Sequence, residues 1–326
     1  MRSGFLFPLM NSLAHTLKSI DYDALPLSDY SRSYILQLLP NIDYYMAIYH
    51  RCLRRVLDAA AKRPDELTLV DYGGGHGFLS LTAKRCGVGK VVYVDLNPQA
   101  AEAVRAVSQA VGEGPDVVLT GDSVTLRSWC KENNVVPDIL MGMDVIEHIY
   151  RLEDFFADIY AVSPRVKMLF TTGSTPYNPW VRRRLRRIME SDESQFFHMR
   201  WAFIQEHFPD MPEQERVSWA FCTRGLNYED ILRCMDGDRH LPWMDAYNTC
   251  DPATGSWTER IVPISVYRGM LSPYGARLRV HKGFYNANRP GLKGFASDLL
   301  NALLHLPLTH WLAPFIILQT DTKSKI

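Results

Sequence analysis

The feature that most constrains this chain of 326 residues is a short apolar run that passes through an aspartate into four glycines. The run 67–70 is typical of a buried strand, Asp71 follows it, and glycines stand at positions 73, 74, 75 and 77. Helical spacing of apolar residues begins at Phe78. Glycines permit a tight turn, and a helix N-terminus offers free N–H groups with partial positive charge. The stretch therefore predicts a ligand-binding turn.

The glycine spacing argues against a dinucleotide. In the dinucleotide fingerprint G-x-G-x-x-G the last glycine would fall on Phe78, so that fingerprint is incomplete. The pattern present is acid-x-G-x-G-x-G, from Asp71 to Gly77, and a second acid, Asp95, ends the next apolar strand, 90–94. Together these motifs resemble the class I S-adenosylmethionine-dependent methyltransferases.

The resemblance implies S-adenosylmethionine as cofactor, with Gly73, Gly75 and Gly77 beside its methionine and sugar parts. Asp95 would accept the ribose hydroxyls, and Asp122 would bind the adenine amino group. The alternatives are a tight turn without a ligand, a strand-end or helix-capping role for Asp95, and a turn role for Asp122. The residues expected to bind the cofactor are Asp71, Tyr72, Gly73, Gly75, Gly77, Asp95, Leu96, Asp122, Ser123 and Asp144.

Strands and helices alternate through the middle of the chain, which predicts an α/β fold with a doubly wound parallel sheet. Asp71, Asp95, Asp122 and Asp144 all fall at carboxyl ends of strands, where such sheets bind ligands. The resemblance implies a mostly parallel, seven-stranded, Rossmann-like sheet that ends in an antiparallel hairpin, here 276–285 with 315–320. We expect an N-terminal helical cap (1–64), a cofactor-binding core (65–175), an insertion after the fifth strand forming the substrate region (176–254), and completion of the sheet (255–326).

The second informative stretch is Asp144-Val-Ile-Glu147-His148, after the fourth strand. It resembles the acid-x-x-Glu-His motif of ubiquinone-biosynthesis O-methyltransferases and small-RNA 2′-O-methyltransferases. If it opens a helix, the three side chains share one face and suit Mg²⁺, Mn²⁺ or Zn²⁺. His198, or otherwise His207, would complete the metal site. The alternatives are a metal-free site in which Asp144 or His148 is the general base, and a purely structural histidine.

The charge balance and the cysteine content of the chain indicate which partners and which compartment to expect. Lys+Arg and Asp+Glu both number 36, so no net charge favours nucleic acid. The arginine-rich helix expected over 181–189 is interpreted as a solvated amphipathic face, as a clamp for an anionic substrate, or as a contact with anionic lipid at a membrane surface. Six cysteines without a C-x-x-C pair predict reduced thiols and a cytoplasmic protein. No apolar run suits a bilayer span, and 1–14 is a poor signal peptide with an amphipathic pattern.

The leading hypothesis is a methyltransferase that transfers a methyl group from S-adenosylmethionine to a small-molecule acceptor, at oxygen. The oxygen follows from the resemblance around Asp144, Glu147 and His148. The alternatives are an RNA 2′-O-methyltransferase and an inactive S-adenosylmethionine-binding partner protein, with a dehydrogenase disfavoured by Phe78. We expect the acceptor to be decided by the helical cap and by the insertion beginning at Gly173.

Overall fold

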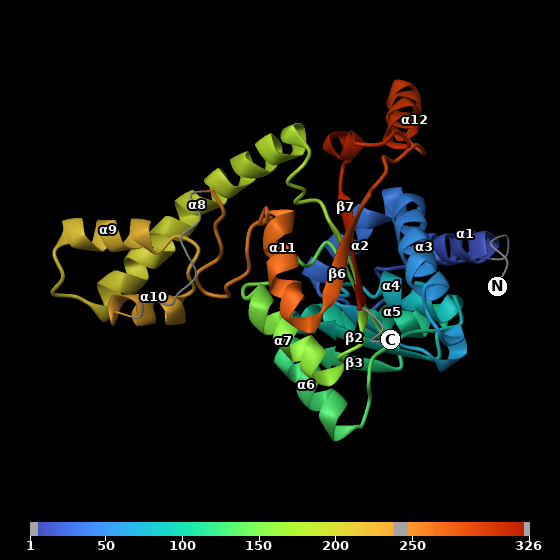
Figure 1. The fold of residues 1–326 in the computed structure, drawn as a ribbon, viewed down its shortest axis with the longest axis horizontal. Helices are drawn as coiled ribbons and strands as arrows, with labels where there is room; N and C mark the ends of the chain where they lie inside the picture. The colour runs from blue at the N-terminus through green and yellow to red at the C-terminus, as the bar shows by residue number, and fades with distance from the viewer. Residues whose placement is uncertain (1–5, 238–246, 323–326) are drawn as a thin grey trace.

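A seven-stranded sheet forms the centre of the chain in a computed structural model that describes residues 6–237 and 247–322 (Figure 1). The strand order is β3-β2-β1-β4-β5-β7-β6, and the neighbours are parallel except where β7 pairs with β5 and β6. The predicted mostly parallel, doubly wound sheet is confirmed. The strands are β1 (Thr68–Tyr72), β2 (Lys90–Asp95), β3 (Val117–Thr120), β4 (Ile139–Met143), β5 (Lys167–Thr172), β6 (Ala276–Lys282) and β7 (Ile316–Thr322).

Alternate residues of the central strands bury on opposite faces, as the two-residue period of a strand requires. Val70 and Val92 join a core with α6 (Ser123–Glu132), α7 (Leu152–Val162) and α11 (Ile264–Leu271). Leu69 and Val91 point to the other face, against α3 (Ile42–Asp58) and α4 (Phe78–Arg85). Tyr93 buries against α5 (Pro98–Val111) on that second face. The sheet is therefore covered on both sides.

The antiparallel hairpin carries an insertion of its own. β6 runs parallel to β5, because both are antiparallel to β7. The chain therefore leaves β6 at the same edge of the sheet at which it leaves β5, and α12 (Leu292–Leu304) follows there. Helix α11 begins only at Ile264, after its N-cap Pro263, and residues 255–263 before it form a strap without helical structure.

The N-terminal helices α1 (Leu6–Ser19), α2 (Asp29–Leu38) and α3 lie against α4 and α5. Ile35 and Met46 from this region share a buried cluster with Leu81 of α4. Residues 1–5 of the expected amphipathic start lie outside the described residues. Within the described ranges, no helix combines the length and apolar character needed to cross a membrane.

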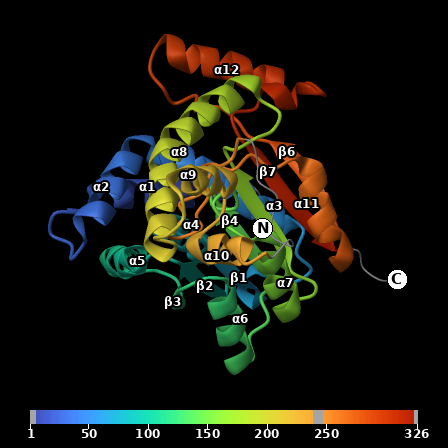
Figure 2. The ribbon, with the colours of Figure 1, turned by 90° about the vertical axis from the view of Figure 1, so that its left-hand side faces the viewer.

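The segment after β5 forms an arm that projects away from the sheet (Figures 1 and 2). Its long helix α8 (Pro179–His207) extends far beyond the predicted 181–189, because the irregular apolar spacing after Met189 still buries residues against α9 (Glu213–Cys222) and α10 (Tyr228–Met235). Ile204, Ala220 and Ile231 form a small separate core there. The arm therefore has its own small core and contributes little to the cores on the two faces of the sheet.

Gly77 fixes how the glycine turn packs against α5. It caps α4 with φ 76° and ψ 14°, a left-handed conformation that glycine adopts without strain. A Cβ at this position would lie 2.1 Å from Cγ2 of Val104. Gly112 at the end of α5 has the same dihedral angles, but nothing lies within 4 Å of its Cβ position. The two glycines therefore share a backbone constraint and differ in packing.

We expect Gly112→Ala to lower the free energy of unfolding by about 1 kcal/mol, the cost of a left-handed alanine. Gly77→Ala should cost about 1 to 3 kcal/mol more, because its methyl group overlaps Val104. Urea unfolding of both variants measures the difference. Val104→Ala in the Gly77→Ala background should recover part of the loss, and equal costs for the two glycines would contradict the packing argument.

Candidate functional site

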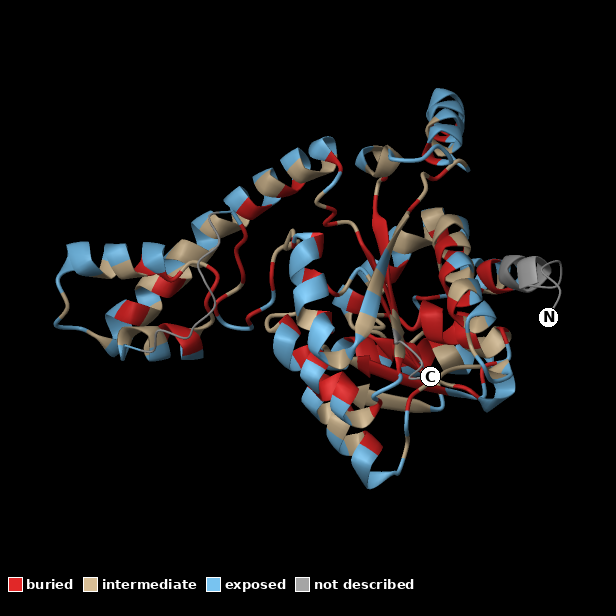
Figure 3. Cartoon of the chain, in the orientation of Figure 1, coloured by how far each residue is buried: buried red, intermediate tan, exposed pale blue. Residues whose placement is uncertain are grey.

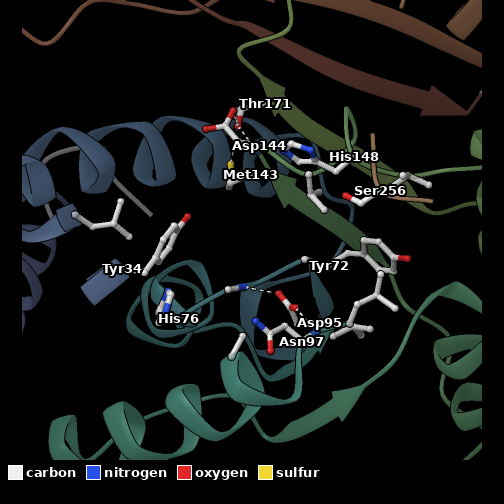
Figure 4. Close-up of a pocket in the computed structure, with 18 of the residues that line it drawn as sticks. Tyr34, Tyr72, His76, Asp95, Asn97, Met143, Asp144, His148, Thr171 and Ser256 are labelled. Carbon is white, nitrogen blue, oxygen red and sulfur yellow. Dashed lines mark hydrogen bonds between the residues drawn. The ribbon is translucent and has the colours of Figure 1, made fainter. Parts of the chain in front are cut away.

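A pocket of about 470 Å³ opens at the carboxyl ends of the central strands (Figure 4). Asp144 and His148 lie on one wall, and Asp95 and Asn97 lie on the opposite wall. The N-terminal helices and the strap before α11 close the sides, through residues such as Tyr34 and Ser256. The carboxyl ends of the strands and the N-terminal helices therefore meet at this pocket.

The glycine turn forms the floor and is held by the end of β2. Backbone N–H groups of Gly73 and Gly74 donate to the carbonyl of Val94, at 2.8 and 3.2 Å. The Tyr93 hydroxyl donates to the carbonyl of Gly75. Gly75 lines the pocket with φ 52°, and no atom lies within 4 Å of its Cβ position. A ligand can therefore approach the backbone closely here.

Asp95 stands where β2 ends and lines the pocket. One carboxylate oxygen accepts from the Gly75 N–H and the other from the Asn97 N–H, both at 2.8 Å. Burial raises the pKa of this carboxyl group, and the two backbone hydrogen bonds oppose that rise. Leu96, beside it, is 72% exposed and also lines the pocket. An exposed leucine next to a positioned carboxylate suits a ligand that has both a flat apolar part and hydroxyl groups.

Four residues expected to bind the cofactor lie outside the pocket lining. Asp71 is buried and accepts a hydrogen bond of 2.7 Å from the Ser80 hydroxyl of α4. Gly77 packs against α5 as described. Asp122 caps α6, since its Oδ1 accepts from the N–H groups of residues 124 and 125, and Ser123 donates to Asp158. Gly121 takes the pocket position at the end of β3.

The segment after β4 is a turn, and the predicted helical face of Asp144, Glu147 and His148 is wrong. Asp144 has φ 50°, and its N–H donates to the Thr171 carbonyl at 3.1 Å, so the chain leaves β4 along β5. The Thr171 hydroxyl donates to Asp144 Oδ1 at 3.3 Å. Desolvation, followed by the negative charge of Glu259, raises the Asp144 pKa.

His148 lines the pocket, and a backbone carbonyl fixes the orientation of its ring. Its Nδ1 lies 2.7 Å from the backbone carbonyl of Trp257, which can only accept a hydrogen bond. Nδ1 therefore carries the proton, and in the neutral ring Nε2 is the acceptor. Neither the strap nor Trp257 was predicted as part of the site, because only the fold brings Trp257 to His148.

The predicted metal ligands do not assemble. Within residues 6–237 and 247–322, no group of three or more His, Cys, Asp or Glu side chains is placed to hold a metal ion. Glu147 is buried, and desolvation together with Asp144 raises its pKa well above its usual range. His198 and His207 are exposed on α8 and do not line the pocket. The residues present do not fit the predicted metal.

Aromatic side chains from α2 and α3 cover the pocket, and none of them was predicted as part of the site. Tyr34 stacks on His76 of the glycine turn, with ring centroids 4.5 Å apart. His76 is buried, and this burial lowers its pKa to about 4, so its ring is neutral at neutral pH. Burial also raises the pKa of the Tyr34 hydroxyl. This side of the pocket is therefore aromatic and carries no charge at neutral pH.

The features of the site match the requirements of an S-adenosyl cofactor. The Gly75 backbone is open to a ligand, the Asp95 carboxylate is held at the strand end, and Leu96 is exposed beside it. The fold and this site define a class I S-adenosylmethionine-dependent methyltransferase.

The sequence model of the methyltransferase domain family matches residues 43–231, more than half of the chain. The chain belongs to that methyltransferase domain family. Ribosomal protein L11 methyltransferase from Burkholderia mallei is 50% identical over 42 residues, which cover 13% of this chain and 14% of that relative. A corresponding enzyme from Dechloromonas aromatica is 45% identical over 58 residues, covering 18% and 19%. The matches thus span less than a fifth of these relatives.

Two solved structures are similar over most of their length. Magnesium protoporphyrin IX methyltransferase from Synechocystis PCC 6803, with bound SAH, has a TM-score of 0.42 and 13% identity over 84% of this chain and 83% of that chain. The plantazolicin methyltransferase BpumL in complex with SAH has a TM-score of 0.42 and 11% identity, over 98% of this chain and 99% of that chain.

Burial of Asp71 predicts a pH-dependent stability. Desolvation raises the Asp71 pKa from 3.8 to about 7, so between these values the folded chain holds a proton that the unfolded chain lacks. Stability should therefore fall as pH rises through this window. Asp71→Asn should remove that contribution, of about 1 to 4 kcal/mol.

Urea unfolding at pH 5 and pH 8 gives the pH dependence of stability for Asp71→Asn and for the unaltered chain. The other buried acids contribute equally to the pH dependence of both proteins, so the difference reports Asp71. Asp116→Asn is the control, because Asp116 pairs with Lys84 at the opposite edge of the sheet. Equal pH dependence for Asp71→Asn and the unaltered chain would contradict the assignment.

Proposed function

We propose that this methyltransferase methylates a hydroxyl oxygen of a small molecule, with His148 as general base. The observation that carries the proposal is the Nδ1 contact to the Trp257 carbonyl, which leaves Nε2 as a proton acceptor in the pocket. S-adenosylmethionine supplies an activated, positively charged methyl group when it is bound. The protein has to align the acceptor and to take its proton.

We assign Asp95 to the ribose hydroxyls, because its carboxylate is already oriented by Gly75 and Asn97. Gly73 and Gly75 approach the methionine and sugar parts, and Leu96 packs against the adenine. Tyr72 lines the floor between them. The contacts of Asp122 and Ser123 with the adenine remain predictions. Both side chains already make hydrogen bonds within the protein, Asp122 to the start of α6 and Ser123 to Asp158.

The base acts together with the acid beside it. Asp144 lies close enough to His148 for the positive imidazolium to lower the Asp144 pKa. By the same interaction Asp144 stabilises the imidazolium that forms when Nε2 takes the acceptor proton. Trp257 holds the ring orientation through Nδ1. We propose no metal-dependent step, because the expected ligands do not assemble.

The walls indicate the kind of acceptor. Tyr30, Tyr34, Tyr45 and Tyr49 line the side formed by α2 and α3. Rings of this kind bind flat or apolar bodies, and the neutral His76 adds no charge. We therefore propose an acceptor with an aromatic or apolar body and a hydroxyl group that reaches His148. A radiolabelled-methyl screen of hydroxylated aromatic compounds tests the proposal. Cofactor binding without transfer to any of them would favour an inactive partner protein.

Asp95→Asn should weaken S-adenosylmethionine binding about 10-fold or more, because one charge-assisted hydrogen-bond acceptor becomes an amide. Isothermal titration calorimetry measures the affinity. Asp122→Asn tests the adenine assignment in the same way, and we expect a smaller effect because Oδ1 already caps α6. Asp116→Asn is the control outside the pocket. Unchanged affinity in Asp95→Asn would refute the ribose assignment.

His148→Gln should lower kcat by about 100-fold or more without changing cofactor affinity, because glutamine cannot take the acceptor proton. Single-turnover kinetics separates this effect from binding. His198→Gln should retain full activity, since His198 is exposed and lies outside the pocket. Loss of activity in both variants, together with inhibition by a chelator, would instead support the metal-site hypothesis.

A further inference from the structure

Most of α12 is exposed to solvent (Figure 3), and one of its exposed faces is apolar. Its residues recur at the three- and four-residue spacing of a single helical face. Leu292 is 88% exposed and Phe295 is 71% exposed. The face comprises Leu292, Phe295, Leu299 and Leu303, and Leu306 in the turn after the helix is also exposed. This set is larger than the scattered exposed apolar residues that soluble proteins normally show.

The opposite face of α12 binds the protein. Gly294, Ser297 and Leu304 are buried against the rest of the chain. Lys293 and Asp298 are exposed and occupy the flanks between the two faces. The helix therefore has a defined orientation, with its apolar face turned outward.

Two tryptophans extend the apolar surface beyond α12. Trp311, in the turn after this helix, lies with its ring centroid 5.7 Å from that of Trp180 at the start of α8. Both side chains are exposed, and Leu308 between α12 and Trp311 is 89% exposed. Tryptophan is enriched where a protein meets the interface between lipid and water. We call α12, Leu308 and the two tryptophans the apolar surface.

Arginines adjoin the apolar surface. The first turns of α8, which lie at the same end of the molecule as α12 in Figures 1 and 2, carry Arg182, Arg183, Arg184, Arg186 and Arg187. Arg183, Arg184 and Arg187 are exposed and form no ion pair within the described ranges. Arg186 lies over the Tyr247 ring, and Glu190 is the nearest acid along the helix.

A cationic cleft of about 490 Å³ lies under α12, between this helix, α3 and the end of β6. Arg51, Arg55 and Lys282 line it together with His281, His305 and His310, and its lining contains no acidic residue. Lys282 donates to the Leu306 carbonyl at 2.7 Å, and Arg51 lies over the Phe284 ring. The positive charges in the cleft are therefore not neutralised by carboxylates in its lining.

We propose that the apolar surface docks this protein on an anionic phospholipid bilayer. The apolar side chains enter the acyl region, the two indole rings lie at the headgroup level, and the arginines of α8 and the cationic cleft bind lipid phosphates. Charge favours a bilayer over a second copy of the chain. A twofold contact through this face would bring the same arginines opposite each other, which costs free energy.

The docking surface lies on the edge of the sheet that carries the pocket. α8 follows β5, and α12 follows β6, which is parallel to β5. Both segments therefore leave the sheet at the carboxyl ends where Asp95 and Asp144 line the pocket. A bilayer on this surface faces the pocket side of the molecule, and this placement does not depend on which molecule is methylated.

Flotation of the purified chain with vesicles tests the proposal, with phosphatidylcholine alone or mixed with phosphatidylglycerol as the anionic lipid. We expect binding to the mixed vesicles and much weaker binding to phosphatidylcholine. Phe295→Ser with Leu299→Ser should weaken binding about tenfold or more, and Arg183→Glu with Arg187→Glu should weaken it selectively on anionic vesicles. Val217→Ser with Phe221→Ser on α9 is the matched control, since both residues are exposed one turn apart.

Circular dichroism and cofactor titration confirm that each variant is folded. No binding of the folded chain to mixed vesicles would overturn the proposal, and so would equal binding by the Phe295→Ser, Leu299→Ser variant. Sedimentation velocity gives a separate check. A dimer that dissociates on Phe295→Ser with Leu299→Ser would assign the face to a second copy of the chain and would also overturn the proposal.

Discussion

The hydrogen bonds that the Asp95 carboxylate accepts from Gly75 and Asn97 are the interactions on which the site depends. They join the turn after β1 to the start of α5, so two separate strand ends become one rigid floor. The neighbouring bonds from Gly73 and Gly74 to the Val94 carbonyl act in the same direction. A floor built in this way needs little rearrangement to receive a ligand, and preorganisation of this kind favours affinity. The opposite wall depends on it indirectly, because Gly73 packs against Val145 in the turn that leads to His148.

Buried strands and the turns after them could be predicted because a buried strand shows as a continuous apolar run and a tight turn needs glycine. Asp95 lines the pocket, whereas Asp122 does not. Both are acids after a strand, and the difference lies in backbone N–H groups that the sequence does not show. The Asp122 Oδ1 accepts hydrogen bonds from two backbone N–H groups of α6, and these bonds turn the carboxylate toward the helix. The length of α8 was underestimated because its buried contacts are with α9 and α10.

The wall around His148 could not be predicted, because it depends on contacts between distant segments. Trp257 orients the His148 ring, and Glu259 raises the pKa of Asp144, yet both stand more than a hundred residues further along the chain. Tyr34 reaches the pocket from the N-terminal helices. Asp144 and His148 line the pocket, but the turn conformation of their segment follows from the bonds between Thr171 and Asp144. The local sequence therefore identified residues that line the pocket, but it did not determine their conformation or their hydrogen bonds.

The buried carboxylate of Asp230, in α10, accepts hydrogen bonds from the Tyr150 hydroxyl and from Arg151. Tyr150 lines the pocket two residues after His148, so one side chain ties the projecting arm to the wall that carries the proposed base. The arm and that wall are therefore joined through two hydrogen bonds to one buried carboxylate. Because the Asp230 side chain is fully buried, water competes less for this connection than for an exposed ion pair.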